Sequence, residues 1–194
     1  MLLSDAQRRL APNCVNIALH ARLANCYSSL GRHEESLRIN RDLVAIQARG
    51  LGPSHLDTLR AANNLANTLR VIGKHHIAEA RSLMRKTIEL GTGAYGSDDA
   101  TVISHRWTYA ETLFKIEEPS LDDLIEAESV LEDVTSKMNR VFGSLHPHTV
   151  GAGQDLATVQ DAIARKRAAP EIPFDLKTPE RIGCKSQRPP GKNT

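Results

Sequence analysis

Apolar and polar positions follow a helical spacing along most of the chain, and the pattern recurs. Residues 51–73 form a turn followed by one amphipathic stretch. Within this stretch, Leu65-Ala66-Asn67 and Gly73 repeat, 42 residues downstream, the arrangement of Leu23-Ala24-Asn25 and Gly31. Self-similarity at a fixed period is the signature of a stacked repeat protein. The pattern therefore predicts an all-α solenoid built from pairs of antiparallel helices.

Each helix pair is predicted from two kinds of segment. First helices are expected over residues 15–30, 54–72, 98–116 and 147–167. Second helices are expected within three segments that align without a gap, 36–52, 80–96 and 127–143. Each of these begins with a small residue, which lets paired helices approach closely, and ends in a glycine that supplies the left-handed position after a helix. The total is about seven helices.

The chain divides into three predicted parts. Residues 1–12 are a partial upstream repeat or an N-terminal helix, which Pro12-Asn13 is expected to end. Residues 13–168 form the array of about three and a half repeats. Residues 169–194 are basic and rich in proline, so we expect a disordered tail.

Charge and cysteine content narrow the class of protein. The 194 residues carry a net charge of +2, with 4% aromatic residues and three cysteines that form no CxxC pair. Cys26 is expected on the apolar face of its helix, as a small hydrophobic residue. No segment approaches the ~20 apolar residues that span a bilayer. Because the basic residues gather in the tail, the body is mildly acidic, which argues against a nucleic-acid groove. We expect a cytoplasmic protein that binds neither membrane nor nucleic acid.

Motifs for catalysis or cofactor binding are weak. Residues 91–96 satisfy GxGxxG, but they close an amphipathic helix and follow no strand, so no nucleotide is expected there. His75-His76 with Glu79 lacks a third ligand at a suitable spacing for zinc. No nucleophile motif appears. The sequence therefore predicts no catalytic residue, no cofactor and no metal site.

The repeat pattern resembles that of tetratricopeptide (TPR) repeats more than that of HEAT arrays, the other family with a similar period. The segment LGPSHLDTLRAANNLANTLRVIGK, followed by EARSLMRKTIEL, is similar to the 42-residue TPR of kinesin light chains. The resemblance covers roughly residues 10–165. The third repeat departs from it, because residues 94–99 contain no His-Pro. No long heptad precedes the repeats, so a kinesin heavy chain is not an implied partner.

The resemblance implies a right-handed superhelix whose first helices line a concave groove for a peptide or helix of a partner. It places Asn25, Asn67 and Glu111 at equivalent groove positions, with Asn63 and Arg70 on the same face of one helix. Asparagine suits this role because it both donates to and accepts from a peptide backbone. Trp107 is expected either in the core or as an aromatic anchor in the groove. Alternatively, these six side chains bind no partner and are either solvated or packed within the protein.

The expected function is thus a non-catalytic scaffold that holds a segment of another protein. Two alternatives remain open. The first is a structural module that forms homo-oligomers through the ends of the stack. The second is a regulatory fragment of a larger protein whose catalytic domain lies elsewhere.

Overall fold

The computed structural model describes residues 5–168, and it describes side chains for residues 17–73 and 75–168. Over residues 5–168 the chain forms seven α-helices, one short 3-10 helix and no strand. The α-helices are α1 Asp5–Ser29, α2 His33–Leu51, α3 Leu56–Ile72, α4 Ile77–Tyr95, α5 Ala100–Phe114, α6 Leu121–Phe142 and α7 Pro147–Ala168. The 3-10 helix η1 spans Lys74–His76. None of the described helices is long and apolar enough to cross a membrane.

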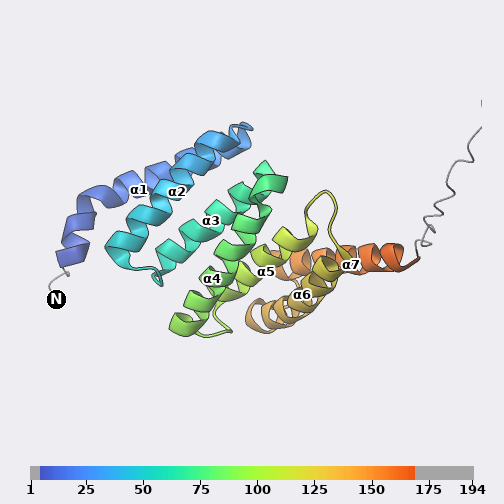
Figure 1. Ribbon diagram of the computed structural model, residues 1–194. Helices are drawn as coiled ribbons and strands as arrows, with labels where there is room; N and C mark the ends of the chain where they lie inside the picture. The colour runs from blue at the N-terminus through green and yellow to red at the C-terminus, as the bar shows by residue number, and fades with distance from the viewer. Residues whose placement is uncertain (1–4, 169–194) are drawn as a thin grey trace, which may run out of the picture.

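Consecutive helices pack as antiparallel pairs that stack one on the next (Figure 1). The pairs are α1–α2, α3–α4 and α5–α6, and α7 covers the last pair. The first helix of each pair also packs on the second helix of the preceding pair. In addition, α3 contacts α5 directly, so these two first helices lie side by side. The predicted helix-pair solenoid is confirmed.

Small residues bring the paired helices together, as the sequence predicts. Ser36, Ala80 and Ala127, which open the aligned segments of the second helices, are fully buried. Ala24, Ala66 and Ala110, which follow the apolar residue of the first helices, are fully buried too. Ala157 stands at the same place in α7 but is exposed, because no second helix covers α7 among the described residues.

Glycines end the helices in a conformation that other residues rarely adopt. Gly52, Gly96 and Gly143 have φ of 96°, 88° and 89° with ψ near 160°. The positive φ agrees with the prediction, but the ψ angle does not belong to the left-handed helical region. It belongs to an extended region with positive φ that is essentially restricted to glycine. The N-termini are capped as well: Asp99 accepts from two amides of α5, and Ser120 forms a capping box with Asp123.

Two expectations for the N-terminal helix are wrong. The predicted break at Pro12-Asn13 does not end a helix, because α1 continues from Asp5 to Ser29. Its ribbon bends in the N-terminal part instead (Figure 1), as proline within a helix commonly causes. Cys26 is exposed, not packed, because the face of α1 that carries it has no neighbouring helix among the described residues. The predicted tail, 169–194, lies outside the described residues.

Candidate functional site

Residues of the first helices form a polar surface that we call the inner face: Asn63, Asn67 and Arg70 of α3, Trp107, Glu111 and Lys115 at α5, and Asp155 of α7. Asn63, Asn67 and Arg70 lie four and three residues apart, so they share one side of α3. Leu65 and Leu69 of α3 lie on the other side of the helix and are buried. The amphipathic pattern of α3 thus fixes the inner face.

A chain of charged contacts runs across the inner face from α3 to α7. Arg70 lies 3.9 Å from Glu111, and the Lys115 ammonium lies 2.6 Å from the same carboxylate. Lys115 also lies 3.1 Å from Asp155. The Trp107 indole N–H donates to Asp155 at 2.8 Å. Three first helices are therefore joined by side chains 40 or more residues apart in sequence.

These charges are only partly exposed to water, which strengthens their interaction. The side chains of Glu111, Asp155 and Arg70 are 17%, 15% and 20% exposed. Burial alone would lower the pKa of Lys115, but the hydrogen bonds and charges of Glu111 and Asp155 outweigh it and raise that pKa. Lys115 therefore remains a cation at neutral pH.

Two polar atoms of the inner face have no hydrogen-bond partner in the protein. They are Oδ1 of Asn63 and Nε of Arg70, both buried. A buried polar atom left unpaired costs about 1–3 kcal/mol. A ligand or a water molecule that reached them would recover part of that cost. Asn67 is half-buried between them.

The six residues singled out in the sequence do not form one cluster. The structure brings together Arg70, Glu111 and Trp107 through the charged contacts, with Asn63 and Asn67 on the same side of α3. Asn25 is exposed on α1, and the hydrogen bonds of the described residues do not connect it to the others. Trp107 is half-buried and packs against two core clusters while its N–H faces Asp155, so it belongs to both core and inner face.

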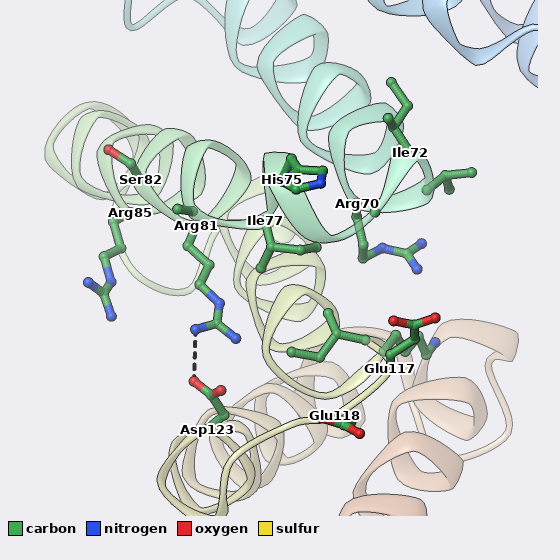
Figure 2. Close-up of a pocket in the computed structure, with 15 residues that line it drawn as sticks. Arg70, Ile72, His75, Ile77, Arg81, Ser82, Arg85, Glu117, Glu118 and Asp123 are labelled. Carbon is green, nitrogen blue, oxygen red and sulfur yellow. Dashed lines mark ion pairs between the residues drawn. The ribbon is translucent and has the colours of Figure 1, made fainter.

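A large pocket opens beside the inner face, at the turns of the second and third pairs. We call it the turn pocket; its cavity volume is ≈ 1210 Å³. Arg81 reaches across it from α4 to Asp123 near the start of α6, at 2.8 Å, while Arg70 extends from the end of α3 (Figure 2). Arg70 and Lys115 line both the pocket and the inner face, so the two surfaces are continuous.

The lining of the turn pocket combines an apolar part with charges of both signs. Ile72, Ile77 and Ile116 supply aliphatic surface, and the carboxylates of Glu117 and Glu118 belong to the same lining as the arginines. Burial would raise the pKa of Asp123, but Arg81 and Ser120 outweigh it and lower that pKa. Such a lining suits an apolar side chain of a partner with polar groups beside it. No motif in the sequence indicated a pocket at these turns.

A smaller pocket lies at the other end of α3 and α5 and contains histidine and aromatic rings. Phe142 stacks on His146 with ring centroids 4.7 Å apart, and His148 meets Trp107 edge-on at 5.9 Å. His105 lines the same pocket and is 2% exposed, and burial lowers its pKa to about 4. Within the part of the chain that the structure describes, no three His, Cys, Asp or Glu side chains are grouped to hold a metal ion.

Comparison with known proteins shows which repeat and which fold this chain resembles. Residues 15–80 match the model of the tetratricopeptide repeat. No curated protein matches the sequence. A structure of nearly identical TPR-like repeats from a Podosopora anserina kinesin light chain is 19% identical, with a TM-score of 0.67 over 84% of this chain and 72% of that one. A point variant of the same repeats gives 20% identity and the same TM-score over 78% and 69%.

A third structure, BtubC (BKLC) from P. vanneervenii, is 16% identical, with a TM-score of 0.57 over 92% of this chain and 71% of that one. At these identities the likeness shows the fold. Residues 15–80 therefore match the tetratricopeptide repeat, and the described chain as a whole has the all-α superhelical fold seen in kinesin light chain-like TPR proteins.

Proposed function

We propose that this protein is a non-catalytic scaffold that binds a peptide or helix segment of a partner protein along the inner face. TPR repeats generally mediate protein–protein interaction and are typically non-catalytic. The single observation that carries the proposal is the pair of unpartnered buried polar atoms, Asn63 Oδ1 and Arg70 Nε, on a face whose helices have already buried their apolar residues. The three cysteines without a CxxC pair support a cytoplasmic location.

The inner face favours a partner segment of low net charge. Its cations Arg70 and Lys115 are already balanced by Glu111 and Asp155 at 2.6–3.9 Å. A strongly charged segment would have to break these contacts. An amide-rich backbone with one apolar side chain in the turn pocket would leave them intact, and Asn63 and Asn67 would pair with that backbone.

Affinity capture from extract with the double variant Asn63→Ala/Asn67→Ala tests this proposal. We expect a captured partner to bind about 10-fold or more weakly, since two hydrogen bonds worth roughly 0.5–1.5 kcal/mol each are lost. The melting temperature should change little, because both side chains are only half-buried. The dissociation constant of the identified partner, measured by calorimetry, gives the size of the effect.

The matched control is Asn139→Ala, which removes an exposed asparagine from the second helix α6, away from the inner face. It should bind like the wild type. Equal affinity of the wild type and the double variant would contradict binding along the inner face.

A further inference from the structure

The face of α1 that points away from α2 carries a stripe of exposed apolar residues. Leu19, Leu23 and Leu30 are 58%, 43% and 72% exposed, and Cys26 is exposed between them. Leu19, Leu23 and Cys26 lie four and three residues apart, which places them on one side of α1, and Leu30 follows directly after Ser29, the last residue of the helix. We call them the outer stripe. Three exposed leucines this close together are unusual for a surface in contact with water.

The corresponding residues of later first helices are buried. In α3 the same positions are Ala61, Leu65, Thr68 and Ile72, and the first three are 5–6% exposed. In α5 they are His105, Tyr109, Thr112 and Ile116, and the first three are 0–5% exposed. In α7, Ala152, Val159 and Ile163 of the stripe are 0–4% exposed. The outer stripe is therefore a repeat interface left uncovered.

The buried stripes all face the second helix of the preceding pair. Ala61 packs in one cluster with Ile39 and Leu43 of α2, and Thr68 Oγ1 accepts from Asn40 Nδ2 of α2 at 2.9 Å. One repeat later, Arg85 of α4 donates to the Tyr109 hydroxyl at 2.8 Å. By this repetition, the outer stripe of α1 is shaped for a second helix of the same kind.

A ladder of ion pairs fixes the register between successive second helices. Arg41 of α2 lies 2.8 Å from Glu79 of α4, and Arg85 of α4 lies 3.4 Å from Glu126 of α6. Within one helix the arginine follows a glutamate by six residues: Arg41 follows Glu35 in α2, and Arg85 follows Glu79 at α4. Glu35 of α2 is the equivalent of Glu79 and Glu126, and within the described residues it pairs only with its neighbour Arg32. It occupies the position that would receive an arginine from a preceding pair.

The other end of the stack is different. The uncovered side of α7 presents exposed Ala157, Gln160 and Ala164, and its large apolar residue is Val150, which is 44% exposed. A polar outer surface is what a terminal capping helix requires. The ladder also stops there, because Glu132 of α6 stands where Arg41 and Arg85 stand in the earlier pairs. Of the two ends of the described stack, the α1 end is therefore the one that carries a row of exposed leucines.

We propose that the outer stripe of α1 is a docking surface for a TPR-type helix pair of a partner protein, one that presents an aliphatic second helix with an arginine opposite Glu35. This goes beyond the binding of a segment along the inner face. The aliphatic contacts supply the stability, and the exposed ion pair supplies the register.

The course of α1 favours a separate chain as the source of this pair. In the other junctions a short turn, such as residues 52–55, separates the second helix of one pair from the first helix of the next. The equivalent residues 10–13 are helical, so α1 runs on through the place where such a turn would lie. A second copy of this chain fits poorly in a head-to-tail stack, because α7 covers α6 and Glu132 would meet Glu35.

The test supplies a matching pair of known sequence. Residues 53–97, which contain α3, α4 and Arg85, are tethered to the N-terminus of the complete chain through about 15 Gly and Ser residues. Tethering raises the effective concentration to the millimolar range. Cys14→Ser and Cys184→Ser leave Cys26 as the single thiol, in the centre of the outer stripe. The rate of its alkylation under native conditions reports coverage.

Docking should slow the alkylation of Cys26 by about tenfold or more, as for a thiol protected by a local opening equilibrium. Arg85→Glu in the tethered pair should raise the alkylation rate severalfold, as expected for an exposed ion pair worth about 0–1 kcal/mol, and Glu35→Arg in the chain should then slow it again. Leu23→Asp should abolish protection. This charge-swap rescue separates register-specific docking from non-specific contact.

Unchanged alkylation of Cys26 in the tethered protein would overturn the proposal, since the same α4 surface packs stably on α5 within the chain. If Cys26 is protected equally with and without the two charge changes, the assigned register is wrong. A dimer of the untethered chain by light scattering, dissociated by Leu23→Asp, would overturn the proposal by making a second copy the occupant. None of these outcomes depends on whether the inner face binds a peptide.

Discussion

Leu65→Asp is expected to unfold the array. Leu65 is 6% exposed and packs with Leu37 of α2 and Leu69 and Ala80 of its own pair. Truncating such a leucine costs about 2–5 kcal/mol, and an aspartate adds the cost of placing a carboxylate among aliphatic side chains. The total is comparable to the ~5–15 kcal/mol that stabilises a whole domain. In a stack, losing one interface also separates the pairs on either side of it.

Thermal unfolding followed by circular dichroism at 222 nm checks this expectation. The matched control is Leu145→Asp at a side chain that is 90% exposed, where we expect a change within about 0.5 kcal/mol. Ala66→Trp should act like Leu65→Asp, because Ala66 is fully buried where α3 meets α4. A cooperative melt of wild-type midpoint for Leu65→Asp or Ala66→Trp would contradict the assignment of α3 to a packed pair.

His105 is expected to make the protein sensitive to mild acid. Burial lowers its pKa to about 4, against 6.5 for a solvated histidine, and its Nδ1 has no partner in the protein. Because the unfolded chain binds this proton first, the stability is complete above pH 6.5 and is lost as the pH falls toward 4. The loss amounts to about 2.5 kcal/mol by pH 4.5.

Urea unfolding at pH 7 and pH 4.5 measures this loss in the wild type and in His105→Leu. The variant should lose about 2.5 kcal/mol less between the two pH values. His75→Leu, at an exposed histidine, should keep the wild-type dependence. Asp98 and Asp123, whose pKa values are lowered by their basic partners, lose their contribution at lower pH still. An identical pH dependence in wild type and His105→Leu would contradict a neutral, buried His105.

The pairing of helices was predictable because its causes are local and recur. Ser36, Ala80 and Ala127 mark the close approach within each pair, and the glycines mark the ends of the helices. What failed was local information at α1. Pro12-Asn13 predicts the end of a helix, yet α1 continues through it. Cys26 was predicted on a buried face because the repeat pattern implies that another helix pair precedes α1, and it is exposed. A sequence pattern shows which face is apolar, but only packing shows whether that face is covered.

The site was predictable only in part. The spacing of Asn63, Asn67 and Arg70 was sufficient to place them on one side of α3. The chain from Arg70 through Glu111 and Lys115 to Asp155 was not predicted, because it depends on the stacking angle between three helices. Lys115 and Asp155 carried no motif. The turn pocket was missed for the same reason, since it forms between the turn that follows α3 and the turn that follows α5.

Hydrogen exchange of the protein with and without its captured partner tests the central claim most directly. The account predicts added protection in α3 and α5 and in the turns that line the turn pocket, since the side chains of the inner face come from these elements. Amides of α2 and of the outer side of α6 should exchange as in the free protein. Protection confined to α1 or α7, with α3 and α5 unchanged, would contradict binding along the inner face.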